Sequence, residues 1–242
     1  MGIGLLLLPL LALLVRTPWT RMSALLTEGP VQEALWLSIR CATAATALSL
    51  LVGVPLAWLL ARSALPGRRV LRGLVALPLV LPPVVGGVAL LLAFGRNGVL
   101  GPLLVAGGAV PAFTTTGVII AETFVALPFL VLTVEGALAG LPRDHEEVAG
   151  TLGAKPLRVF LSVTLPAIGP SVLAGAVLAG ARALGEFGAT ITFAGSLSGQ
   201  TQTVPLEIYQ LLDDDPPAAY ALSAVLLLVS AAMVLALRSW RR

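Results

Sequence analysis

Two ionisable side chains, Arg182 and Glu186, lie four positions apart in an otherwise apolar stretch. At this spacing opposite charges meet on one face of a helix, so the two can form an ion pair that only fixes helix packing. Alternatively, the guanidinium can offer a passing anion a transient positive contact, which the carboxylate keeps weak. Glu122, in another apolar stretch, is a candidate additional partner for Arg182. The sequence leaves the packing and the anion-contact interpretations open.

Residue types needed for other kinds of chemistry are scarce. The sole histidine, His145, lies among charged residues, and the sole cysteine, Cys41, can form neither an internal disulfide nor a thiolate cluster. We therefore predict no metal site and no catalytic residue. The sequence has no phosphate-binding Gly-x-x-x-x-Gly-Lys-Ser/Thr loop, so we expect this chain to bind no cofactor and not to hydrolyse ATP by itself.

The elements that position these residues are expected to lie in a membrane. Hydrophobic residues make up 57% of the 242 positions and charged residues 11%, whereas about a quarter of the residues in soluble domains are charged. Because hydrocarbon forces every backbone polar group to pair internally, long apolar runs without alternation predict helices rather than a barrel. We predict an all-α, polytopic protein of the cell inner membrane, surrounded by lipid.

A run of about 20 apolar residues is long enough to cross a bilayer. Five such runs are predicted, at residues 34–60, 70–94, 117–138, 167–193 and 218–237. A sixth, shorter run at 4–15 is interpreted as a retained helix, with the apolar region of a signal peptide as the alternative. The run 99–110 contains glycine and proline and is expected to be interfacial or re-entrant rather than a seventh span.

The second of these runs is expected to bend. Pro82 and Pro83, with Pro78, Gly86 and Gly87, remove helical hydrogen bonds and side-chain bulk. A kinked helix can act as a gate, although such residues are also tolerated in a packed bundle.

Basic residues indicate how the spans are oriented. With six spans and the N-terminus inside, the cytoplasmic segments would hold Arg62, Arg68, Arg69, Arg72, Arg143, Lys155, Arg158, Arg238, Arg241 and Arg242. The external segments would hold only Arg16, Arg21 and Arg96. Because positive charge is enriched on the cytoplasmic side, both termini are predicted to be cytoplasmic. The acidic external segment 196–217 is either a solvated connection or a docking surface for an external partner.

The loop 141–166 is too long and too patterned for a mere connection. Asp144 is expected to cap a short helix, with Glu147 as the reciprocal member of a capping box. Gly153 is placed to end this helix in a left-handed conformation. The apolar residues of one face are Val148 and Leu152. Such a helix at the cytoplasmic mouth either binds a partner or lies on the headgroups.

Glu147-Val148-Ala149, followed by Gly153 and then by Val163-x-Leu165-Pro166, resembles the EAA motif of binding-protein-dependent ABC importer permeases. In that family the loop is a coupling helix that seats in a groove of the ATP-binding subunit. The resemblance therefore implies a single permease domain over residues 1–242 with a cytoplasmic coupling loop at 141–166. The residues assigned to ATPase coupling are Asp144, Glu147, Val148, Ala149, Leu152, Gly153, Leu165 and Pro166.

Three further segments, 77–86, 181–190 and 201–209, resemble the molybdate permease subfamily. This resemblance implies a type I importer fold with six transmembrane helices and a homodimer around the pathway. It also implies ATP-binding subunits, which use the ATP, and an external substrate-binding protein. The substrate would be an oxyanion, molybdate, with tungstate or sulfate/thiosulfate as alternatives. Candidate pathway residues are Arg182, Glu186, Glu122, Pro82 and Pro83.

The same residues disfavour two rival functions. A stand-alone secondary carrier is disfavoured because six spans provide only half a pathway and no internal repeat is apparent. A polytopic membrane enzyme would need paired Asp, His or Cys residues at one mouth, and none is present. No nucleic-acid partner is expected.

Overall fold

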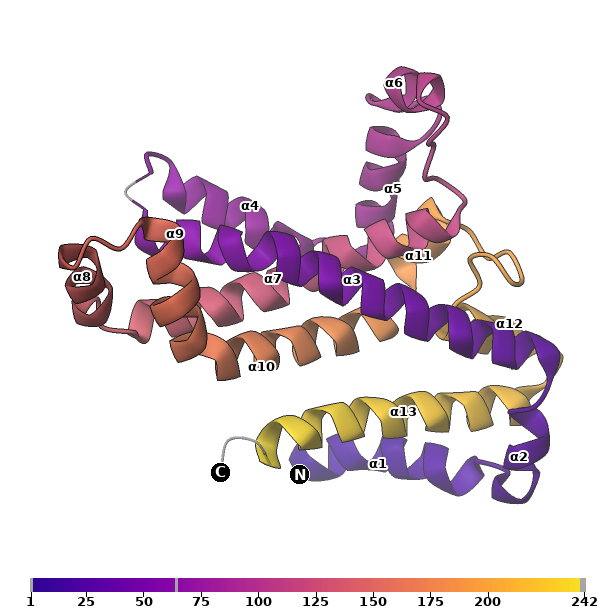
Figure 1. Ribbon diagram of the computed structural model, residues 1–242. Coiled ribbons are helices and arrows are strands. Elements are labelled where there is room, and N and C mark those ends of the chain that lie inside the picture. The colour runs from indigo at the N-terminus through magenta and orange to yellow at the C-terminus, as the bar shows by residue number, and fades with distance from the viewer. Residues whose placement is uncertain (1, 64, 240–242) are drawn as a thin grey trace.

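The computed structural model describes residues 2–63 and 65–239, and within these ranges it contains helices and no strand (Figure 1). The all-α prediction is therefore confirmed. The α-helices are α1 (Gly2–Arg16), α2 (Met22–Leu25), α3 (Gly29–Arg62), α4 (Arg68–Val80), α5 (Pro83–Phe94), α6 (Gly101–Ala106), α7 (Thr115–Gly140), α8 (Asp144–Thr151), α9 (Pro156–Val159), α10 (Leu165–Leu184), α11 (Gly188–Phe193), α12 (Val204–Asp214) and α13 (Pro216–Ser239). A short 3-10 helix (Trp19–Arg21) and a π-helical turn (Phe160–Thr164) complete the set.

Four stretches of helix are long and apolar enough to cross a membrane: Gly29–Arg62, Thr115–Gly140, Pro156–Leu184 and Pro216–Leu237. Two bent pairs, Gly2–Arg16 with Trp19–Leu25 and Arg68–Val80 with Pro83–Phe94, would raise the number to six if each is one broken span. These four helices and two bent pairs correspond to the six predicted spans. Helix α6, in the run predicted to be too short to span, has only six residues.

The predicted span 70–94 is broken rather than merely kinked. The chain direction bends by 118° between α4 and α5, because Leu81 and Pro82 between them have extended ψ angles of 134° and 133°. Proline cannot continue a helix, and the residue before a proline avoids the helical region. The prolines therefore predict where the span bends, but they do not predict how large the bend is.

The predicted continuous span 167–193 is wrong in its second half. Helix α10 ends at Leu184, and α11 begins only at Gly188. Arg182 thus lies in the last turn of α10, whereas Glu186 lies in the break between the two helices. Hydrophobicity alone does not reveal this break, because the residues on both sides of it are equally apolar.

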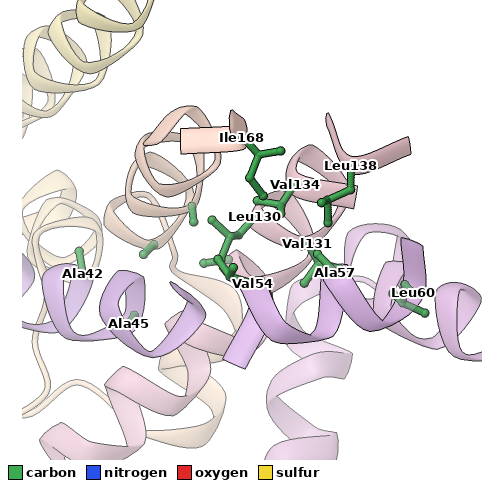
Figure 2. Packing of buried hydrophobic residues seen from close by; sticks show 13 residues of the cluster. Ala42, Ala45, Val54, Ala57, Leu60, Leu130, Val131, Val134, Leu138 and Ile168 are labelled. Atoms are coloured by element: carbon green, nitrogen blue, oxygen red, sulfur yellow. The ribbon is translucent and has the colours of Figure 1, made fainter. Parts of the chain in front are cut away.

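Helices α3, α7 and α10 form the central bundle, with Leu130 and Val131 of α7 facing α3 (Figure 2). A Cβ atom at Gly53 of α3 or at Gly175 of α10 would lie 2.9 Å from a Leu130 methyl group. Because apolar side chains gain little by leaving lipid for protein, helices in membranes associate through such close packing at small residues. Leu130 seated between two glycines therefore holds the three helices together.

Helix α1 runs alongside α13, outside this bundle (Figure 1). It has no buried residue, and leucines such as Leu5 and Leu6 are more than two-thirds exposed. The start of α1, the end of α13 and helix α8 lie toward the same end of the molecule (Figure 1). Arg241 and Arg242, which entered the orientation prediction, lie outside the described residues.

Candidate functional site

Helix α8 begins at Asp144, one residue earlier than a cap at Asp144 requires. Its N-cap is Arg143, and no side chain caps its first turn. The capping box of Asp144 and Glu147 is therefore wrong, because Asp144 already lies inside the helix. The first turn instead carries the carboxylates of Asp144, Glu146 and Glu147, whose negative charge complements the positive end of the helix dipole.

The end of α8 is as predicted. Gly153 has a φ angle of 84°, and its N–H donates to the Gly150 carbonyl at 2.9 Å, while the Ala154 N–H donates to the Ala149 carbonyl at 3.1 Å. This is the left-handed termination that favours glycine. Beyond it the chain turns back through α9 and the π-helical turn into α10, which begins at Leu165 and Pro166.

The apolar face of α8 is not covered by any of the residues that the structure describes. Val148 is 58% exposed and Leu152 84% exposed, although both are large apolar side chains at helical spacing. The opposite face carries the contacts that fix α8 to the rest of the molecule.

Glu146 makes those contacts, and sequence reasoning did not single it out. Its Oε1 lies 3.3 Å from Arg62 Nη2 and accepts a hydrogen bond from Thr164 Oγ1 at 2.8 Å. Arg62 also donates to the Leu141 carbonyl at 3.0 Å. The signal in the sequence was the helical wheel, since Glu146 lies about 200° from Val148 and so faces inward. Helix α8 is therefore tied to the end of α3 and to the start of α10.

The pair Arg182 and Glu186 forms across the end of α10. Arg182 Nη2 lies 2.5 Å from Glu186 Oε2, and Glu186 Oε1 accepts a hydrogen bond from the Ala189 N–H at 2.7 Å. The carboxylate is buried, whereas the guanidinium side chain is 29% exposed. Glu186 thus bridges α10 and α11, and Arg182 keeps part of its charge accessible.

The two helix breaks lie side by side. A Cβ atom at Gly188, two residues after Glu186, would lie 2.6 Å from the Pro83 Cβ at the start of α5. Helix α5 packs along α11 from this point, and Figure 1 shows the two helices adjoining. The structure therefore places Pro83, at the start of α5, beside the break that contains Glu186.

Glu122 is buried on α7, and its Oε2 has no hydrogen-bond partner in the part of the chain that the structure describes. Arg182 has Glu186, rather than Glu122, as its carboxylate partner. A third ion pair, between Arg72 of α4 and Glu135 of α7, was not predicted from the sequence, and its Nε to Oε1 distance is 2.7 Å. It fixes the first half of the broken span to the bundle.

The sequence is similar to those of known membrane transport proteins. Residues 53–241 match the family model described as "Binding-protein-dependent transport system inner membrane component". The chain is 53% identical to "Molybdenum transport system permease protein ModB" of Mycobacterium bovis, over 97% of this chain and 89% of that protein. It is 37% identical to "Sulfate transport system permease protein CysT" of Salmonella typhimurium, over 93% of this chain and 83% of that protein.

Solved structures show the same fold at low sequence identity. A chain of a bacterial alginate ABC transporter, in complex with a periplasmic protein bound to an alginate pentasaccharide, superposes with a TM-score of 0.72 at 19% identity. The superposition covers 97% of this chain and 87% of that chain. The arrangement of helices is thus shared with a chain of that transporter.

Proposed function

The chain belongs to the family of binding-protein-dependent transport system inner membrane components, and we propose that the substrate it carries across the membrane is molybdate. It is a multi-pass permease subunit with an ABC importer fold. The relative named for molybdenum transport is the more similar one, at 53% identity against 37% for the sulfate permease. Tungstate and sulfate/thiosulfate are the competing substrates, because molybdate, tungstate and sulfate are all tetrahedral dianions.

Helix α8 is the dock for a separate ATP-binding subunit, which supplies the ATP hydrolysis. One observation carries this proposal. Helix α8 lies at the surface with Val148 and Leu152 exposed, while Glu146 on its other face fixes it to the rest of the molecule. An apolar helix face presented to a groove is a recurring mode of protein recognition. The coupling residues of the loop 141–166, with Leu165 and Pro166 at the start of α10, transmit motion to the membrane helices.

Two copies of the chain enclose the pathway, and an external binding protein delivers the anion. One copy leaves large apolar side chains of α1, α4 and α5 exposed, which lipid or a second copy would cover. Arg182 is the positive contact for the dianion, since its side chain keeps 29% exposure beside the two helix breaks. Glu186, Glu122, Pro82 and Pro83 shape this part of the pathway. The whole chain, residues 1–242, is a single permease domain.

Both termini face the cytoplasm in this proposal, as does the loop between α3 and α4. The support is the arginine distribution, together with the position of the start of α1 and the end of α13 toward the α8 end of the molecule (Figure 1). A Cys41→Ala protein carrying Pro66→Cys should react with a membrane-impermeant thiol reagent only from inside. The matched variant Ser198→Cys should react only from outside. The reverse labelling would invert the topology.

Substrate choice is tested by competition during uptake. Labelled molybdate should enter cells that express the chain with its ATP-binding subunit and binding protein. Excess unlabelled molybdate should suppress this uptake more strongly than excess sulfate. Equal or stronger suppression by sulfate would make this chain a sulfate permease, and suppression by tungstate at lower concentration than by molybdate would make tungstate the substrate.

A further inference from the structure

A cavity of about 580 Å³ lies where α3 ends and α4 begins, at the α8 end of the molecule. Four arginines line it: Arg62, Arg68, Arg69 and Arg143. We propose that this cavity is a binding site for a tetrahedral oxyanion of the phosphate type. The proposal concerns a site distant from the candidate pathway, and it holds whichever substrate the permease carries.

The charge of this cluster is largely uncompensated. Arg62 has the carboxylate of Glu146 as a partner, and among the described residues the Arg68 side chain donates only to the Ser63 carbonyl, at 3.3 Å. The side chains of Arg69 and Arg143 form no ion pair or hydrogen bond with the described residues. Three guanidinium groups thus share a small volume with no carboxylate of their own, an arrangement that an anion would stabilise.

Arg62 provides the second observation. Its side chain is only 9% exposed, and its Nε is buried with no acceptor among the residues that the structure describes. Buried donors are nearly always paired, since an unpaired one loses its bonds to water and gains none in return. Arg62 is one of the residues that line the cavity, so an anion bound there would lie beside a guanidinium group whose donors are not all paired.

The backbone at the start of α4 also favours an anion in this cavity. Helix α4 has 13 residues, and its N-cap, Gly67, has a φ angle of 81° and no side chain to cap the first turn. No atom lies within 4 Å of the position where a Gly67 Cβ would stand, so the helix start is open. The free N–H groups and the positive end of the helix dipole favour an anion at this point.

The chemistry of the donors indicates the ligand class. Planar guanidinium groups bind tetrahedral oxyanions through paired N–H donors, and basic pockets between helices on the cytoplasmic side bind lipid head groups. Two sources share this chemistry, namely the phosphate of an anionic lipid and a free oxyanion in the cytoplasm. Because Arg62 also holds Glu146, an anion that relieves the repulsion around Arg62 would strengthen the link between α3 and α8.

The test uses the full-length chain, purified in detergent. In one arm, native mass spectrometry follows titration with phosphatidylglycerol and, separately, with neutral phosphatidylcholine. In the other arm, thermal unfolding is followed with inorganic phosphate or molybdate, against chloride at the same ionic strength. We expect saturable binding in at least one arm. Arg68→Gln with Arg69→Gln should weaken it by about tenfold or more, because charge-assisted hydrogen bonds are lost.

The control is Arg16→Gln with Arg21→Gln, which removes the same charge from exposed arginines elsewhere. It should bind like the unaltered chain. Binding of phosphatidylglycerol alone assigns the site to a lipid head group, whereas binding of free phosphate or molybdate assigns it to a soluble anion. If the double variant misfolds, Arg69→Gln replaces it, since that exposed side chain has no partner to lose. Absence of saturable binding in both arms, or unchanged binding in the variant, would overturn the proposal.

Discussion

Arg62, the last residue of α3, and Glu146, in the first turn of α8, are joined by an ion pair with 3.3 Å between Nη2 and Oε1. Both side chains are mostly buried, at 9% and 17% exposure. Through Thr164, the same carboxylate also reaches the turn that leads into α10. A force on α8 would therefore be transmitted directly to two membrane helices rather than absorbed by a flexible loop.

The first prediction follows from this pair. Arg62→Ala would leave the Glu146 carboxylate without its charged partner, at a cost of about 3 kcal/mol for a largely buried pair. We expect the variant to insert normally but to transport less oxyanion for each ATP hydrolysed by the complex in proteoliposomes. Arg62→Lys, which keeps the charge, should recover part of the ratio. An unchanged ratio in Arg62→Ala would remove Arg62 and Glu146 from the coupling route.

A second prediction concerns the end of α8. Gly153→Trp places a bulky side chain at a φ angle of 84°, where residues other than glycine are strained by about 1–2 kcal/mol. This variant, and Glu147→Arg, should leave insertion intact but separate ATP hydrolysis from uptake. Gly150→Ala is the matched control, because its Cβ would meet no atom within 4 Å. Normal uptake by both altered proteins at normal expression would exclude α8 as the dock.

Sequence and structure agree where local chemistry decides the conformation. The apolar runs predict the membrane helices, Pro82 and Pro83 mark the bend, and Gly153 marks the end of α8. Contacts between distant segments were not predictable. The pairing of Arg62 with Glu146 depends on how α3 and the loop 141–166 fold together, which no residue spacing reveals.

The break after Leu184 also depends on tertiary structure. It persists because the Glu186 side chain accepts the Ala189 N–H of α11 and so replaces a helical hydrogen bond. Nothing in the apolar run around Glu186 indicates that its carboxylate accepts a hydrogen bond from a backbone N–H.

The third prediction separates packing from anion contact at Arg182 and Glu186. Exchanging the two residues is uninformative, since an arginine at 186 cannot accept the Ala189 N–H. Glu186→Gln keeps an acceptor oxygen and should preserve assembly of the complex. Arg182→Gln removes the accessible charge and should lower oxyanion uptake by about tenfold, the factor that corresponds to 1.4 kcal/mol of lost interaction. Full uptake by Arg182→Gln, with normal assembly, would leave the pair a packing role only.

The fourth prediction concerns Glu207 in α12, outside the membrane spans. Burial, and then the charge of Asp214, raise the pKa of this carboxyl above its ordinary value of 4.5. A raised carboxyl pKa means that the folded state binds the proton more tightly than the unfolded state. The contribution of Glu207 to stability is therefore full below pH 4.5 and declines as the pH rises through the raised pKa.

Glu207→Gln should remove this decline. The difference in melting temperature between the variant and the unaltered chain should grow in favour of the variant as the pH rises above 4.5. Thermal unfolding in detergent at a series of pH values measures it. Parallel curves for the two proteins would show that Glu207 does not titrate differently in the folded state.

We propose above all that this chain forms the membrane pathway of an ATP-driven oxyanion importer. The most direct measurement is uptake of labelled molybdate into proteoliposomes that contain the chain, its ATP-binding subunit and the external binding protein. We predict uptake that requires ATP and all three components, and that stops when the ATP-binding subunit cannot hydrolyse ATP. Uptake that proceeds without ATP, driven by an imposed ion gradient and by this chain alone, would contradict the account.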